Sequence, residues 1–287
     1  MNRSIWEPAL MALGLAASLL IAPVTSLAQT KPITSASPQI RLWRLDCGEM
    51  QMKNFGLFAD DFRFSGQSRL FVNSCYLIQH GSDYLLWDTG LSGDLATKPD
   101  PDGAFTIKRT IIQQLKQLGI TPAQITYVGL SHFHFDHIGQ LKDFPDATLL
   151  IGGEDFDYVK NEAPPQFDKS GFAPWLTGGA KVERVRDRDL FEDQSITILA
   201  TPGHTPGHRV LLVRLPAKGA VLLSGDLFHV AESFDHDLVP FFNTNRADTL
   251  ASIDRFKDIG SVLKATVIIQ HEPRDVAKLP PFPKAAE

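Results

Sequence analysis

Residues 132–137 read His-Phe-His-Phe-Asp-His, and four of these six side chains are of a kind that binds metal ions. Three more follow: His204 in a Thr-Pro-Gly-His segment, Asp226 in Ser-Gly-Asp, and His271 near the end of the chain. Imidazole and carboxylate groups are the ligands that suit Zn²⁺ and its first-row neighbours. The sequence therefore predicts a site for two metal ions and favours metal-dependent hydrolysis.

Each of these residues follows a stretch that the apolar pattern predicts to be a β-strand. Open α/β sheets place their functional sites at such strand ends. The predicted strands are 40–46, 70–79, 84–88, 125–130, 146–151, 195–200, 209–215, 220–223 and 266–270. Helical spacing predicts helices over 107–118, over 154–161 and after an Asn245 cap. This mixture indicates an α/β architecture with helices covering the sheets.

The N-terminal segment has the pattern of a secretory signal peptide. Arg3 precedes an apolar run over 9–22, and Ser26-Leu27-Ala28 has the form of a cleavage site. We expect cleavage after Ala28 and a periplasmic or secreted protein. A retained membrane anchor is the alternative, which the short run and the following Pro23 disfavour. Residues 29–39 are expected to form a disordered linker, which leaves 40–287 for one folded domain without stable membrane association.

Composition narrows the choice of partners. Hydrophobic residues make up 43% of the chain, enough for a buried core, and the net charge is −5 without a basic stripe. This charge balance argues against nucleic-acid binding. We expect a small-molecule substrate, and the protein could form a homodimer. Cys47 and Cys75 form either a disulfide, which export would permit, or two buried thiols on neighbouring strands.

The motifs resemble those of the metallo-β-lactamase superfamily in order and spacing. They are Leu-Leu-Trp-Asp-Thr-Gly at 85–90, the His motif at 131–137, Thr-Pro-Gly-His-Thr-Pro-Gly-His at 201–208, Ser-Gly-Asp at 224–226 and Gln-His-Glu at 270–272. The resemblance implies an αβ/βα sandwich of two mixed β-sheets flanked by helices. It implies one ion bound by His132, His134 and His204. It implies a second ion bound by Asp136, His137 and His271, with Asp226 bridging both.

Within the superfamily, the motifs are most similar to those of N-acyl-homoserine lactonases, which are quorum-quenching enzymes. The resemblance implies a hydrolase that opens the ring of N-acyl-homoserine lactones or related lactones by attack of a hydroxide bridging two divalent ions. Zn²⁺ is the expected ion, with Fe²⁺, Mn²⁺ or Co²⁺ as alternatives. Asp136 would carry a proton to the leaving alkoxide. The alternatives are an organophosphate hydrolase, esterase or β-lactamase of the same fold, or a non-catalytic periplasmic metal-binding protein.

Two residues outside the ligand set are predicted to assist the reaction. His229 stands three residues after Asp226, where such lactonases usually carry a tyrosine that contacts the substrate, and imidazole can donate a hydrogen bond instead. Its alternative is packing against Phe228 or Phe234. Asp88 either orients a ligand histidine from behind or is simply a turn residue.

The segment 50–64 is rich in methionine and phenylalanine at spacings that fit neither a helix nor a strand. We expect it to be a loop that forms an apolar wall for the acyl chain, since such residues make adaptable pockets. The residues expected to contact the substrate there are Met50, Met52, Phe62 and Phe64. Core packing under a long loop is the alternative.

Overall fold

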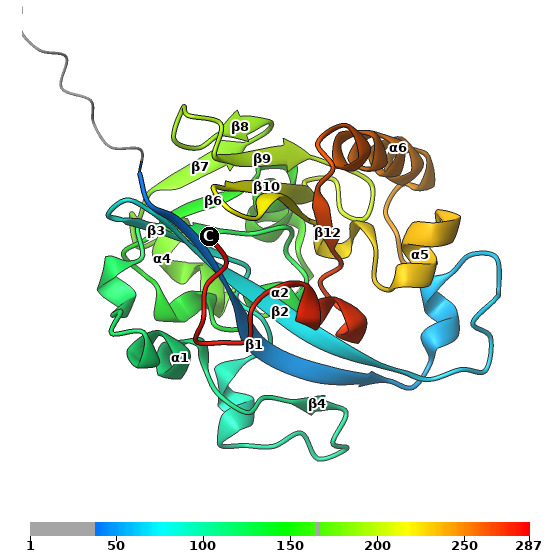
Figure 1. The fold of residues 1–287 in the computed structure, drawn as a ribbon. Coiled ribbons are helices and arrows are strands. Elements are labelled where there is room, and N and C mark those ends of the chain that lie inside the picture. Colours follow the sequence, from blue (N-terminus) through cyan, green and yellow to red (C-terminus); the bar gives the residue numbers. More distant parts are fainter. Residues whose placement is uncertain (1–37, 165–166) are drawn as a thin grey trace, which may run out of the picture. The chain divides into compact units, whose positions relative to one another are not determined.

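The computed structural model describes residues 38–164 and 167–287 (Figure 1). The predicted signal peptide and most of the predicted linker lie outside the described residues. Residues from Pro38 to Glu287 form one unit built on two β-sheets. Among the described residues, none of the helices is both long and apolar enough for a membrane span.

The first sheet has seven strands in the order β4-β1-β2-β3-β5-β6-β7. Strands β1 to β4 pair antiparallel, whereas β3, β5, β6 and β7 run parallel, so the sheet is mixed. The bounds are β1 Ile40–Met52, β2 Arg69–His80, β3 Asp83–Trp87, β4 Phe105–Thr106, β5 Tyr127–Gly129, β6 Thr148–Gly152 and β7 Val182–Val185.

The second sheet has five strands in the order β12-β11-β10-β9-β8. It is also mixed, because β11 and β12 run parallel while the other neighbours are antiparallel. The bounds are β8 Arg188–Asp189, β9 Ile196–Ala200, β10 Arg209–Leu215, β11 Gly219–Leu223 and β12 Thr266–Ile268.

Alternation along the strands explains why the sheets form layers. Tyr76 and Ile78 of β2 face the second sheet and pack with its Ile198 and Leu211. Their neighbour Leu77 points the other way, as the period of two requires, into a second core under the helices. The sandwich therefore has one apolar core between its sheets and further cores on its outer faces.

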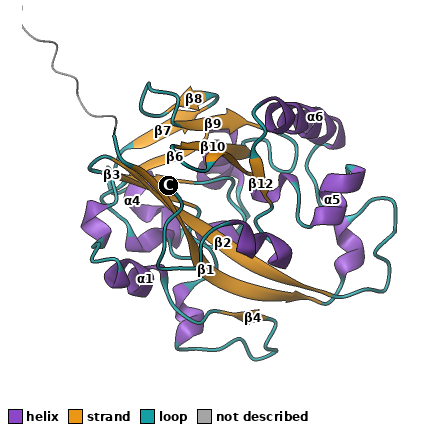
Figure 2. Ribbon diagram, in the orientation of Figure 1, coloured by secondary structure: helices purple, strands orange, loops and turns teal. Residues whose placement is uncertain are grey.

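Helices cover both outer faces (Figure 2). Ile111 and Leu115 of α1 pack on the first sheet, and Ile253 and Phe256 of α6 pack on the second. The helix bounds are α1 Ile111–Gln117, α2 Phe135–Ile138, α3 Gly153–Asp157, α4 Ala173–Leu176, α5 Ala231–His236 and α6 Arg246–Val262. The predicted αβ/βα sandwich of two mixed sheets is confirmed.

Strand β1 is longer than the sequence pattern predicts. It continues past an irregularity between Asp46 and Glu49 and pairs with β2 as far as Met52. Gly48 lies at this irregularity with φ 119°, a conformation that glycine adopts readily. Met50 and Met52 therefore belong to a strand, not to the predicted loop.

The two cysteines lie on the neighbouring strands β1 and β2. Cys47 and Cys75 have Cα atoms 5.8 Å apart and form a disulfide. The structure thus decides between the two alternatives that the sequence left open.

Candidate metal centre

All seven predicted ligands lie together at one edge of the sandwich, because each follows the end of a strand. Strands β5, β11 and β12 end at residues 129, 223 and 268, and His132, Asp226 and His271 each stand three positions further on. His134 precedes α2, while His204 lies in the loop between β9 and β10. Two groups result: His132, His134, His204 and Asp226, and Asp136, His137, Asp226 and His271.

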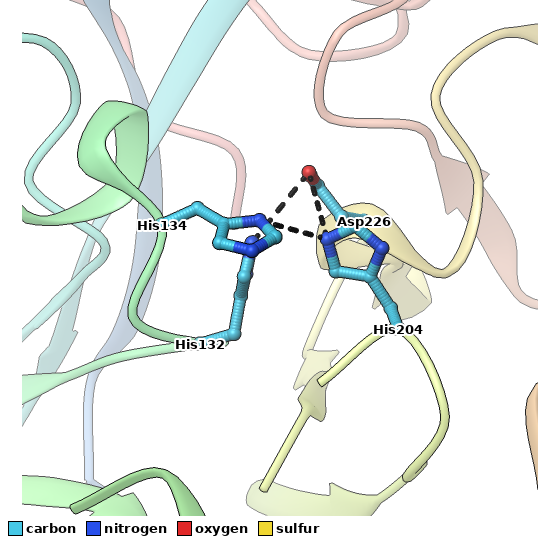
Figure 3. A group of neighbouring side chains, drawn as sticks. All are labelled: His132, His134, His204 and Asp226. Atoms are coloured by element: carbon cyan, nitrogen blue, oxygen red, sulfur yellow. Dashed lines mark hydrogen bonds and ion pairs between the residues drawn. The ribbon is translucent and has the colours of Figure 1, made fainter. Parts of the chain in front are cut away.

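The first group converges on one oxygen of Asp226 (Figure 3). Oδ2 of Asp226 lies 3.6 Å from Nε2 of His132 and 3.5 Å from Nε2 of His204. Nδ1 of His134 lies 3.0 Å from the same His204 nitrogen. Three imidazoles and one carboxylate oxygen thus surround a single point, as a tetrahedral metal site requires.

The second group converges on the other oxygen of the same carboxylate. Oδ1 of Asp226 lies 2.9 Å from Nε2 of His271 and 3.1 Å from Nε2 of His137. Oδ2 of Asp136 lies 3.5 Å and 3.6 Å from the same two nitrogens. Asp226 therefore offers one oxygen to each group, the arrangement expected of a carboxylate that bridges two ions.

The residues present fit a pair of cations. Nε2 of His132 is buried and has no hydrogen-bond partner, and Nε2 of His137 faces only carboxylate oxygens of the second group. A buried polar atom without a partner is costly, and most such atoms in proteins are satisfied. Both nitrogens point into the groups just described, where a metal ion would supply the missing partner.

The histidines of the two ligand groups differ in protonation, because burial dominates in the first group and nearby carboxylates dominate in the second. Burial lowers the pKa of His132 and His204 well below the usual value, so both are neutral, as ligands must be. Burial also acts to lower the pKa of His137, but the carboxylates of Asp226, Asp136 and Asp88 raise it well above the usual value. Without metal, the second group therefore holds a proton where a cation would otherwise balance the carboxylates.

Asp88 lies directly behind His137. Its Oδ2 is 3.1 Å from Nδ1 of His137, and its Oδ1 accepts from the backbone N–H of Ser131 at 2.7 Å. The amide of Gln270 donates to Oδ2 at 2.9 Å. Asp88 has a left-handed φ of 60° but is not part of an assigned turn, so its geometry supports the interpretation that it orients a ligand histidine. Ser131 and Gln270 were not identified from the sequence, where nothing separates them from other polar neighbours of a motif.

His208 supports Asp226 from the backbone side. Its Nε2 accepts from the backbone N–H of Asp226 at 3.0 Å, and its Nδ1 lies 2.9 Å from Oγ1 of Thr201. Burial lowers the pKa of His208 to about 3, so the ring stays neutral and keeps both bonds. This histidine is thus a hydrogen-bonded structural residue.

A cavity of about 320 Å³ opens onto both groups. Its polar end is formed by residues of the metal groups and by His229. Its remaining wall is apolar except for Asn54 and comes from Met50, Met52, Leu57, Phe58, Phe71, Phe135 and Phe242. A few polar groups at one end of an apolar cleft are typical of a small-molecule site.

His229 belongs to this cavity. Its Nε2 lies 3.2 Å from Oδ2 of Asp226, and its ring meets Phe58 edge-on at a centroid distance of 4.9 Å. Phe228 and Phe234 instead pack against each other at 5.1 Å. The imidazole is therefore directed at the metal groups.

Of the four residues in the segment 50–64 that were predicted to contact the substrate, only two line the cavity. Met50 and Met52 line the cavity, but Phe62 and Phe64 do not. Phe64 is buried against Phe55 at a centroid distance of 4.2 Å, and Phe62 is 67% exposed. The reason is that the chain forms a short helical turn at Phe55–Phe58 and then leads away from the site.

Four aromatic residues line the cavity although the sequence did not predict them as substrate contacts: Phe58, Phe71, Phe135 and Phe242. Phe71 lies on strand β2, and Phe242 precedes α6. Phe71 is one apolar residue in an alternating strand, so no local signal distinguishes it from a core residue. The segment that carries Phe242 is held near the site by a backbone hydrogen bond of 2.9 Å from its neighbour Phe241 to Leu57, and the Phe242 ring packs edge-on against Phe58.

Residues 68–271 match the metallo-beta-lactamase superfamily. The chain belongs to this superfamily. Among curated members, N-acyl homoserine lactonase AttM of Azorhizobium caulinodans is 28% identical over 260 residues, which cover 82% of this chain and 94% of the relative.

Solved structures of the superfamily share the fold. A quorum-quenching N-acyl homoserine lactone lactonase superposes with a TM-score of 0.73 at 22% identity, over 88% of this chain and 99% of the other. AidC, a dizinc quorum-quenching lactonase solved in complex with a product, superposes with a TM-score of 0.62 at 22% identity. The superposition covers 87% of this chain and 90% of AidC. At such identities the likeness establishes the fold.

Proposed function

We propose that this protein is a hydrolase that uses two divalent ions, in the first place zinc, to open the lactone ring of N-acyl-homoserine lactones. The observation that carries the proposal is the position of Asp226, whose two oxygens face the two ligand groups at the end of an apolar cavity. The naming of curated relatives as N-acyl homoserine lactonases and of a structural neighbour as a dizinc lactonase supports it.

The site can divide the chemistry among its own residues. Two ions bound there would supply hydroxide at neutral pH and polarise the lactone carbonyl. Asp136 borders the cavity and belongs to the second ligand group, where its carboxylate can take up a proton and pass it to the leaving alkoxide. The C–O bond of the ring breaks, and the product keeps a carboxylate and a free hydroxyl group.

His229 and the apolar wall would hold the substrate. The imidazole borders the cavity within reach of the reacting carbonyl or the leaving oxygen, and a hydrogen bond there stabilises developing charge. Met50, Met52 and Phe242 offer apolar surface to the acyl chain at the same time. A polar head at the ions with an apolar tail against this wall is the substrate shape that the cavity favours.

A hydrolysis screen tests the proposed substrate class. The purified protein, loaded with Zn²⁺, is assayed on N-acyl-homoserine lactones of graded chain length, with a phosphotriester, a simple ester and a β-lactam as comparisons. We expect the highest kcat/KM on the lactones. A higher value on the phosphotriester or the β-lactam would reject the assignment, and metal binding without turnover would indicate a metal-binding protein.

We also propose that the protein is exported and acts in the periplasm or outside the cell. The signal-peptide pattern ending at Ala28 supports this, and so does the disulfide between Cys47 and Cys75, since disulfides persist in oxidising compartments. N-terminal sequencing of the protein from fractionated cells should find Gln29 as the first residue. A chain that keeps its leader in the cytosol would contradict the proposal.

A further inference from the structure

We propose that Asp155 is a positioning residue: through the loop that it bonds at Thr205 and Gly207, it sets the place of His204 and, through His208, the place of Asp226. The inference rests on the two-metal site of the proposed function but concerns a residue outside both ligand groups. Asp155 lies on helix α3, directly after strand β6 of the first sheet. Both histidines lie in the loop that joins β9 and β10 of the second sheet.

The carboxylate of Asp155 joins these two parts of the sandwich. The side chain is fully buried, and its Oδ2 accepts from Oγ1 of Thr205 at 2.7 Å. Its Oδ1 accepts from the backbone N–H of Gly207 at 2.6 Å. Both oxygens of one buried group are therefore used to hold a single loop of the other sheet.

The loop packs closely against the end of β6 and the start of α3. A Cβ atom added to Gly207 would lie 2.5 Å from Cγ of Asp155, and one added to Gly152 would collide with the carbonyl oxygen of Gly207. Two backbone segments thus touch at the place where the carboxylate bonds the loop. The close contact and the two hydrogen bonds together hold the loop against the segment that carries Asp155.

The two histidines flank the two anchor points along the loop. His204 precedes Thr205, and its Nε2 lies 3.5 Å from Oδ2 of Asp226. His208 follows Gly207, and its Nε2 accepts from the backbone N–H of Asp226 at 3.0 Å. A shift at Asp155 would therefore reach the first ligand group by two routes that meet at Asp226.

Burying the charged carboxylate of Asp155 costs free energy of folding. Replacing it with an amide therefore removes one hydrogen bond without burying a charge. Burial raises the pKa of Asp155 to about 7, against the hydrogen bonds from Thr205 and Gly207 and the nearby charge of Arg209. An uncharged amide of the same size avoids the cost of burying a charge, so D155N is expected to fold. Its amide nitrogen cannot accept, so one of the two anchors is lost.

Metal titration tests the inference without relying on activity. The purified protein is stripped with a chelator and titrated with Co²⁺, which is followed by its absorption spectrum and by calorimetry. D155N is compared with D157N, a matched control on the same helix whose exposed carboxylate pairs with Arg184. A titration of H271A identifies which of the two binding constants belongs to the second ligand group.

We expect D155N to lose about 10-fold to 100-fold in affinity at the first group, as substitutions behind metal ligands typically do, with the second group changed far less. D157N should match the wild type. The inference would be overturned if D155N bound both ions with wild-type affinity. It would also be overturned if D155N lost affinity equally at both groups and had a lower Tm. Should D155N fail to fold, T205V, which removes only the Oγ1 anchor, is judged by the same selective loss. A wild-type protein that binds fewer than two ions would instead reject the proposed function.

Discussion

Asp88 and His137 form a fully buried pair in which Oδ2 of the carboxylate lies 3.1 Å from Nδ1 of the ring. A proton on Nδ1 directed at this carboxylate leaves Nε2 free to bind a metal ion, so the pair fixes the tautomer as well as the ring orientation. Asp88 is itself held by Ser131 and Gln270, which precede His132 and His271 in sequence. One carboxylate thereby links the two ligand-bearing segments 131–137 and 270–272.

Replacing Asp88 with asparagine should weaken metal binding more than it weakens the fold. The amide preserves the shape but removes the charge that favours the metal-binding tautomer, and a loss of about 10-fold to 100-fold in metal affinity is typical. Metal content after dialysis and a competition titration measure the effect, with the exposed Asp94→Asn as control. Unchanged affinity in D88N would show that the charge of Asp88 does not assist metal binding by His137.

The elements that the sequence predicts well are those with local causes. Helix α6 begins after Asn245 as expected, because the side chain of that residue accepts from the backbone of Asp248 within the same turn. The seven candidate ligands are equally local, since each sits in a short motif directly after a strand. The extension of β1 to Met52 was not predictable, because it depends on pairing with β2 across a bulge.

Which aromatic residues line the cavity could not be predicted from the sequence. Phe64 and Phe71 are both buried phenylalanines near the same segment, and only Phe71 borders the metal groups. The difference arises from the turn at Phe55–Phe58 and from the approach of the segment before α6, which are tertiary features. Composition indicated an apolar wall but could not select its residues.

Replacing Asp226 with alanine should abolish binuclear binding. The substitution removes one oxygen from each ligand group, so both stoichiometry and kcat should fall together. Elemental analysis after gel filtration and a lactone assay measure the two quantities. D226A with two ions and unchanged kcat would disprove the bridging role.

Metal binding should depend on pH in the second ligand group but hardly in the first. Carboxylates raise the pKa of His137 and His271 despite burial, so a proton must leave before the second ion binds. Burial lowers the pKa of His132 and His204, so no proton leaves there near neutral pH. As the pH rises from about 6 to about 8, the metal affinity of the second ligand group should increase about tenfold per pH unit for each proton released, whereas that of the first group should hardly change. Equal pH dependence of the two constants in calorimetric titrations would contradict this.

Truncating the cavity wall should alter chain-length preference without loss of stability. Longer acyl chains should gain about 0.8 kcal/mol in transition-state binding for each buried methylene. Phe242→Ala should flatten this gain, because Phe242 lines the cavity yet remains 44% exposed. Phe64→Ala is the matched comparison, since it should lower Tm through lost core packing and keep the wild-type preference. The reverse pattern in kcat/KM and Tm would restore the original assignment of Phe64 to the substrate wall.

His229 offers the most direct test of the reaction itself. Its Nε2 lies 3.2 Å from Oδ2 of Asp226 and borders the cavity, so it can donate to an oxygen on which charge develops. Such a donor acts mainly in the transition state, and His229→Ala should lower kcat by about 10² to 10³. The metal content should stay at the wild-type value, because His229 belongs to neither ligand group.

The tyrosine variant separates hydrogen bonding from packing. His229→Tyr restores a donor where related lactonases carry a phenol, so it should keep much of the activity that alanine loses. The exposed His236 supplies a control in His236→Ala, which should not alter kcat. If His229→Ala kept wild-type kcat and KM with both ions bound, the imidazole would only fill space beside Phe58. If alanine and tyrosine lost kcat equally, a hydrogen-bond role would be rejected in favour of a requirement for the imidazole ring.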